Sequence, residues 1–167
     1  MKEFEEIYTL YQKDVYHFLL KLSGYDDSAA EELTQESFYQ AFVSFGRFRG
    51  ECEVKSWLCQ IAKNIYYSHV RAQIKQNNMK AKVDVNQEVK AVSAIVEEKI
   101  IGMHIKKIIQ ELEERDRNIV EYRLFGELPY KEIGILLDLK DATVKVLFSR
   151  AKVKIQKRLK EEYGYEI

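Results

Sequence analysis

The residues with the clearest chemistry are the lysines and arginines between positions 140 and 160. This segment holds eight Lys or Arg and a single acid, Asp141. Apolar residues recur through it at spacings of three and four, which is the pattern of one buried face of an amphipathic helix: Val144, Phe148, Ala151, Ile155 and Leu159. The opposite face is cationic, so it can attract the phosphates of a nucleic acid.

A short helix pattern and a break precede this cationic helix. Ile133, Leu136 and Leu137 form a small apolar face, and residues 138–140 interrupt it. Asp138 tolerates the left-handed backbone that a tight turn requires, and Asp141 is expected to cap the second helix. A short helix, a turn and a cationic helix make a helix-turn-helix, whose second helix enters the DNA major groove. The alternative is a solvated basic surface with no ligand.

Composition limits the other possibilities. The 167 residues include 27 basic and 27 acidic side chains, so the cationic segment is a local patch on a neutral protein. One Pro and seven Gly predict long helices. No apolar run is long enough to span a membrane, and no signal peptide is recognisable, so a cytoplasmic location is expected. Two Cys and three scattered His predict reduced thiols, no metal site and no cofactor.

Helical periodicity divides the rest of the chain into two blocks. Three helices are expected in the first, over residues 3–22, from residue 29 with a Ser28 capping box, and around Trp57. Periodicity resumes near Ile95 with a fourth helix, and Asp116 is expected to cap a fifth. The predicted fold is all-α, with two small helical domains at 1–75 and 98–167. A flexible linker over 76–97 joins them, and the second domain contains the helix-turn-helix.

Several motifs in both domains resemble those of one protein family. In the first domain they are AAEELTQESFYQAF (29–42) and FRGECEVKSWLCQIAKN (48–64). In the second they are LEERDRNIVEYRLFGELPYKEIGILL (112–137) and DATVKVLFSRAK (141–152). The chain resembles a bacterial sigma factor of the extracytoplasmic-function (ECF) group, in its minimal two-domain form. The resemblance implies a factor that binds core RNA polymerase, directs it to promoters and helps to open the DNA.

The resemblance also implies roles for individual residues. Contacts to the clamp helices of the largest polymerase subunit fall on Glu32, Gln35 and Glu36. Contacts to the melted minus-10 element fall on Phe48, Arg49, Lys55, Ser56, Lys63, Asn64 and Arg71. Contacts to the minus-35 element fall on Arg123, Tyr130, Lys131, Lys145, Val146, Ser149, Arg150 and Lys152. Val146 and Leu147 depart from the family pattern, which often has Ser and Arg there, and Pro129 replaces the usual Ser or Thr.

Three other classes of protein remain as alternatives. A conventional helix-turn-helix regulator would share the second domain but would not bind core polymerase. A pure protein-interaction bundle would not support transcription from a promoter. An enzyme is disfavoured because no nucleophile, ligand cluster or glycine-rich phosphate loop has useful spacing. An anti-sigma protein is a further partner that the resemblance implies.

Overall fold

A computed structural model describes residues 2–79 and 94–166, and every regular element in these two ranges is helical. We refer to them as the N-terminal half and the C-terminal half. The all-α fold class predicted from the sequence is confirmed. Most of the predicted linker, residues 80–93, lies outside the described residues. Its first four positions belong instead to the last turn of the third helix, which continues to Met79.

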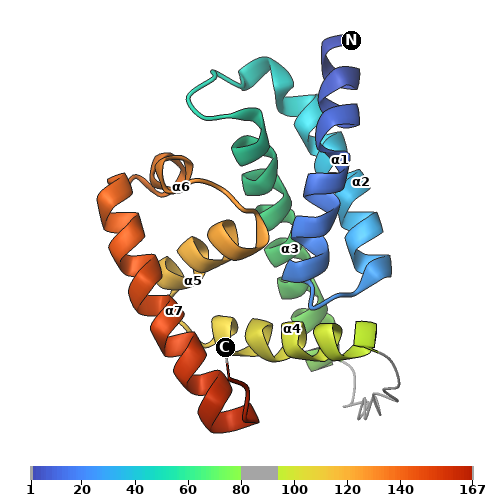
Figure 1. The fold of residues 1–167 in the computed structure, drawn as a ribbon. Coiled ribbons are helices and arrows are strands. Elements are labelled where there is room, and N and C mark those ends of the chain that lie inside the picture. Colours follow the sequence, from blue (N-terminus) through green and yellow to red (C-terminus); the bar gives the residue numbers. More distant parts are fainter. Residues whose placement is uncertain (1, 80–93, 167) are drawn as a thin grey trace.

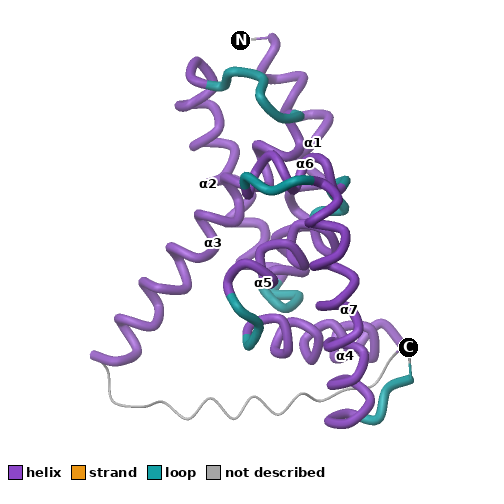
Figure 2. The backbone as a smooth tube through the Cα atoms, turned by 90° about the vertical axis from the view of Figure 1, so that its left-hand side faces the viewer, coloured by secondary structure: helices purple, strands orange, loops and turns teal. Residues whose placement is uncertain are grey.

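The N-terminal half is built from three long helices. These are α1 (Lys2–Leu22), α2 (Asp27–Ser44) and α3 (Val54–Met79), with a 3₁₀ turn, η1 (Phe45–Arg47), after α2. The three helices pack on one another through a common core, drawn in blue to green in Figure 1. Figure 2 shows the C-terminal part of α3 extending away from the other helices. Residues 71–77 are correspondingly exposed.

The C-terminal half contains four α-helices and a π-helical turn. They are α4 (Ala94–Gln110), α5 (Glu114–Val120), η2 (Glu121–Phe125), α6 (Tyr130–Leu137) and α7 (Asp141–Tyr163). All five residues of the predicted apolar stripe of α7 are buried, against α4, α5 and α6. In Figure 1, α7 (red) lies along the outer side of α5 and α6, and α4 (yellow) crosses below them.

The turn between α6 and α7 has the predicted left-handed residue. Asp138 has φ 56° and ψ 49°, and its backbone N–H donates to the carbonyl of Gly134. A Cβ atom at Gly134 would collide with the Leu139 carbonyl oxygen, so glycine at this position allows the turn to fold back against α6. This close approach fixes the angle between the two helices of the helix-turn-helix.

Three predicted helix caps differ from those in the structure. Asp26, rather than Ser28, caps α2 by accepting from the Ala29 N–H at 3.1 Å. Helix α5 begins at Glu114, before Asp116, and its N-cap residue makes no side-chain capping bond. Helix α7 begins at Asp141, which accepts from the neighbouring Ala142 N–H. At α2, closely spaced Asp and Ser residues are alternative caps, whereas the N-cap residues of α5 and α7 make no side-chain capping bond.

The two halves are in direct contact. Helix α1 packs against α4 and η2, and α3 packs against α6. Phe18 of α1 lies parallel to Tyr122 of η2, with 6.4 Å between ring centroids, and both side chains are buried. The sequence predicts two domains joined by a flexible linker, and in the structure the two halves pack directly on each other.

Candidate nucleic-acid interface

The outer face of α7 presents the residues of this helix that were predicted to contact the minus-35 element. Lys145, Val146, Ser149, Arg150 and Lys152 are all exposed on it. The apolar stripe on the opposite side of the helix is buried, and this fixes which side chains point outward. The helix therefore offers positive charge and hydrogen-bond donors on a rigid support, which matches the shape of a major groove.

The other three predicted minus-35 residues lie before and within α6. Lys131 is exposed, whereas Arg123 and Tyr130 are half-buried against each other. The Arg123 guanidinium lies 4.2 Å from the centroid of the Tyr130 ring and donates to the Leu128 carbonyl oxygen at 3.0 Å. This stacking holds the arginine in one orientation, so that its remaining donors can meet a phosphate.

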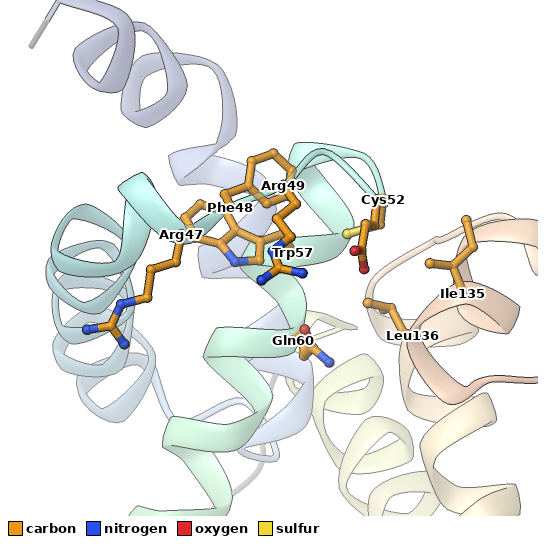
Figure 3. Close-up of a pocket in the computed structure, with 9 residues that line it drawn as sticks. Arg47, Phe48, Arg49, Cys52, Trp57, Gln60, Ile135 and Leu136 are labelled. Carbon is orange, nitrogen blue, oxygen red and sulfur yellow. The ribbon is translucent and has the colours of Figure 1, made fainter.

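A cavity of about 340 Å³ lies where the loop after η1 meets α3. Phe48 and Trp57 form one wall, with ring centroids 4.7 Å apart. Figure 3 shows Arg47, Arg49 and Gln60 around the same space, with Ile135 and Leu136 of α6 opposite. Aromatic faces beside guanidinium and amide groups can stack and hydrogen-bond an unpaired base.

Arg47 and Gln60 line this cavity but were not among the predicted minus-10 residues. Arg47 could have been found from the cluster of Arg and Phe at positions 45–49. Gln60 gives no local signal, since one glutamine on a helix face is ordinary. Trp57 is half-buried between the core and the cavity.

The remaining predicted minus-10 residues divide into two groups along α3. Asn64 and Arg71 are exposed, and Lys55 is half-buried. Ser56 and Lys63 are buried, with 0 % and 6 % of their surface exposed. Both bond to the C-terminal half: Ser56 donates to Glu132 at 2.7 Å, and Lys63 donates to the Asn118 side chain. The structure thus brings Phe48 and Arg49 together at the cavity and keeps Ser56 and Lys63 away from solvent.

Burial at this contact changes the acidity of its polar groups. Desolvation lowers the pKa of Lys63 to about 8, although the Glu121 carboxylate opposes the change. Desolvation also raises the pKa of Tyr67, and the nearby Glu121 adds to this shift. These two side chains lie on α3 and face α5 and η2. They therefore report whether the two halves are in contact.

The predicted polymerase-contacting residues lie on the outer surface of α2. Glu32, Gln35 and Glu36 are exposed on the side of the helix opposite the buried Leu33 and Phe38. Phe42, near the end of the same helix, is 44 % exposed and packs edge-on against Phe4. The surface of α2 therefore combines acidic and aromatic groups that a protein partner could contact.

Residues 2–79 and 94–166 contain neither a metal-binding cluster nor a membrane-spanning helix. Within these ranges no cluster of three or more His, Cys, Asp or Glu side chains is arranged to hold a metal ion. Among the same residues no helix combines the length and apolar character needed to cross a bilayer. Both cysteines are free thiols, and burial raises the pKa of Cys59 to about 12.

The geometry defines an all-helical protein with a helix-turn-helix. Comparison with known families matches the model of sigma-70 region 2 to residues 7–75 and that of sigma-70 region 4 to residues 103–155. The chain belongs to the sigma-70 family of transcription initiation factors, in the ECF group. It is a sigma factor, a non-enzymatic protein that directs RNA polymerase to promoters, and not a conventional helix-turn-helix regulator.

Two curated relatives come from Bacillus subtilis (strain 168). ECF RNA polymerase sigma factor SigM is 28% identical over 152 residues, covering 91% of this chain and 92% of the relative. ECF RNA polymerase sigma factor SigW is 24% identical over 168 residues, covering 95% and 89%. Both alignments span the two halves, so the similarity is not confined to the helix-turn-helix.

Two solved structures share the fold. One is the sigma factor RpoE in complex with the anti-sigma factor NepR from Bartonella quintana, with a TM-score of 0.66, 21% identity and coverage of 96% of this chain and 98% of that one. The other is CnrH in complex with the cytosolic domain of CnrY, with a TM-score of 0.68, 14% identity and coverage of 96% and 89%. At these identities the likeness concerns the arrangement of helices.

Proposed function

We propose that the two halves of this sigma factor bind two separate promoter elements. Residues 1–75 bind core RNA polymerase and melted minus-10 DNA, residues 98–167 read duplex minus-35 DNA, and residues 76–97 connect them. The observation that carries this division is the contrast between the two surfaces. One is a cavity with aromatic and guanidinium walls, suited to a single base, and the other is an exposed cationic helix, suited to a groove.

The minus-10 role rests on what a base needs when it leaves the duplex. It loses its stacking and pairing partners, which costs a few kcal/mol unless a protein replaces them. The Phe48 and Trp57 rings can supply a stacking surface, and Arg49 can neutralise an adjacent phosphate. Asn64 and Arg71, exposed further along α3, extend the same track toward neighbouring nucleotides.

The minus-35 role rests on the side chains that project from α7. Arg150 can donate two hydrogen bonds to one guanine, which is worth roughly 1–3 kcal/mol of discrimination. Val146 is exposed and can contact a thymine methyl group. Lys131, Lys145 and Lys152 offer charge for phosphates, which gives affinity with little sequence choice.

The protein partners follow from the acidic surface of α2 and from the family. Glu32, Gln35 and Glu36 are proposed to contact the clamp helices of the largest polymerase subunit. A cytoplasmic location agrees with that partner. An anti-sigma factor is a second proposed partner, since the solved relatives RpoE and CnrH are each in a complex with another protein, NepR and CnrY respectively.

Run-off transcription with purified core polymerase on a library of randomised promoters tests this function. We expect the chain to select templates with two conserved blocks, one at each element. It should also bind core polymerase when DNA is absent. Failure of the purified chain to bind core polymerase, together with selection of only one block, would contradict the proposal and favour a simple helix-turn-helix DNA-binding protein.

A further inference from the structure

Two polar helix faces line a second cavity, between α3 and α5. On α5, spacings of three and one place Glu114, Arg117 and Asn118 on one side of the helix. On α3, residues at spacings of three and four do the same: Gln60, Lys63, Asn64, Tyr67 and Arg71. The volume between them is about 280 Å³, and we call it the α3–α5 cavity.

Part of the wall of the α3–α5 cavity is apolar. Tyr122 of η2 and Leu136 and Leu137 of α6 contribute to it, and Tyr122 is buried. Apolar walls keep water away from part of the cavity, and hydrogen bonds to charged groups are stronger where the local dielectric constant is low. A charged ligand would therefore be held more firmly there than on an open surface.

Positive charge is in excess around this cavity. Four cations and two carboxylates line it or contact its lining residues: Lys63, Arg71, Lys106 and Arg117, with Glu114 and Glu121. Lys106 and Arg117 each lie 3.7 Å from the Glu121 carboxylate, which also accepts from the Tyr67 hydroxyl. Several cations thus share one buried carboxylate, and the cluster carries two more positive than negative charges.

The cations of the cluster repel one another. Desolvation is the main cause that lowers the pKa of Lys63 to about 8, and the charges of Arg117 and Lys106 lower this pKa further. Within the two described ranges, the buried Nε of Arg117 has no hydrogen-bond acceptor. A buried donor without an acceptor costs free energy. An anion in the cavity would supply an acceptor and reduce the repulsion.

The donors that line the cavity suit a phosphate group. An arginine guanidinium can donate to two phosphate oxygens at once, and Arg71 and Arg117 belong to the two facing helices. Asn118 accepts from Lys63 through its Oδ1, which leaves its amide N–H groups as further donors. An excess of two positive charges favours a dianion over a single carboxylate and disfavours a metal cation.

We propose that the α3–α5 cavity binds a small phosphorylated anion. Its volume is near the lower end of the range for small-molecule sites, roughly 300–1,000 Å³, so the ligand is compact. A DNA strand carries the same phosphate chemistry, but lining residues on two facing helices favour a free ligand over a continuous chain. The inference does not rest on the proposed function, because it uses neither polymerase nor a promoter.

Isothermal titration calorimetry of inorganic pyrophosphate into the full chain tests the site. At about 0.15 M salt, charges more than roughly 8 Å apart are largely screened, so the exposed cationic face of α7 should contribute little. We expect saturable binding to a single site. Gln60→Glu keeps the shape of the side chain and adds a negative charge to the lining, so it should weaken binding at least about tenfold. Arg117→Gln removes a charged donor and should have an effect of similar size.

Each of these variants has a matched control on the same helix. Gln73→Glu adds the same charge at an exposed position of α3 outside the cavity, and Arg115→Gln removes an exposed arginine of α5 that does not line it. Both controls should bind pyrophosphate within about twofold of the wild-type protein. Circular dichroism should show the same helix content in all variants.

The other outcomes would overturn the site. They are the lack of saturable pyrophosphate binding up to millimolar concentrations, and equal weakening by a cavity variant and its control, which would indicate an adventitious ion only. If a single-stranded oligonucleotide bound with the expected dependence on Gln60 and Arg117 while pyrophosphate did not bind, the cavity would belong to DNA instead. If Arg117→Gln does not fold, Gln60→Glu and its control decide. Failure of promoter selection in the separate transcription assay would leave the anion site intact.

Discussion

The two proposed DNA-binding surfaces differ in how accessible they are. On α7, Lys145 and Arg150 are exposed, and the apolar side of the helix is satisfied within the C-terminal half. On α3, Ser56 and Lys63 are buried by residues of the other half. Similar residue types therefore serve different purposes in the closed molecule. A cationic residue near a proposed DNA site can instead be buried in a contact within the protein.

The largest effect is expected from a substitution in the core of the helix-turn-helix, which should destabilise the C-terminal half selectively. Phe148→Ala should destabilise the C-terminal half by about 3–5 kcal/mol, because a buried aromatic ring leaves a cavity. Trp57, the only tryptophan, reports on the N-terminal half. In urea, helix loss followed by circular dichroism should begin earlier than the change in Trp57 fluorescence.

The control for this prediction is Val153→Ala, an exposed position on the same helix, which should change stability by less than about 0.5 kcal/mol. If Phe148→Ala instead shifted both probes together, the halves would unfold as one cooperative unit. The N-terminal half would then not be stably folded without the C-terminal half.

The next largest effect is expected on DNA affinity, from substitutions on the exposed face of α7. Arg150→Ala should cost roughly 1–3 kcal/mol at promoters with a particular minus-35 base and little at others. Lys152→Ala should weaken all promoters alike and reduce the slope of log affinity against log salt by about one. Binding to a panel of duplex oligonucleotides at several salt concentrations measures both. Identical behaviour of the two variants would mean that base reading and phosphate binding are not divided in this way.

The covered surface should respond to pH, because closure lowers the pKa of Lys63 from 10.5 to about 8. The open state binds the extra proton between these values, so closure strengthens as pH rises from 8 toward 10. The charged groups near it are Glu121, Arg117, Lys106 and Glu114. Desolvation also lowers the pKa of Lys106 to about 8, which acts in the same direction. The Lys63 shift should favour closure by roughly tenfold between pH 7.5 and 9.

Small-angle scattering across this pH range measures the closed fraction. Above pH 10 the trend should reverse, since closure raises the pKa of Tyr67 and so opposes its ionisation. Lys63→Met should remove the part of the pH dependence of the closed fraction that is caused by Lys63. A closed fraction that instead fell between pH 8 and 9 would show that other groups control the contact.

The smallest effect is expected from Glu132→Gln. The variant keeps an acceptor oxygen but loses the charge, so the bonds from Glu53 and Ser56 should weaken by about 1 kcal/mol. Hydrogen exchange of the amide groups at residues 53–57 should become about fivefold faster. Glu111→Gln is the matched control, since its ion pair with Arg158 lies within the C-terminal half and is partly exposed. Equal acceleration in both variants would argue against a role for Glu132 in closure.

The helices and the helix-turn-helix could be predicted because their signals are local. The burial of Val144, Phe148 and Leu159 follows from a spacing that any α-helix must obey. The left-handed turn at Asp138 follows from the need to reverse direction in three residues. The cap at Asp26 and the start of α5 at Glu114 were missed, because several acidic or hydroxyl residues lie within two positions of each helix start.

The contact between the halves could not be predicted. Its partners are distant in sequence, such as Ser56 with Glu132 and Lys63 with Asn118, and each is a polar residue of ordinary type. A buried glutamate gives no periodic signal, since in sequence it resembles the solvated glutamates around it. Gly102 likewise gives no signal in the sequence, because the Tyr25 ring that lies against it is distant along the chain. The residue roles at polymerase and DNA remain predictions from the family resemblance.

The π-helical turn at Glu121–Phe125 lies between the buried Glu121 and the helix-turn-helix. A π turn holds one more residue than an α turn would over the same rise. Deleting a residue there would restore an α turn and leave one residue fewer between Glu121 and Glu132. The length of this one turn therefore helps to set how much chain connects the two buried carboxylates.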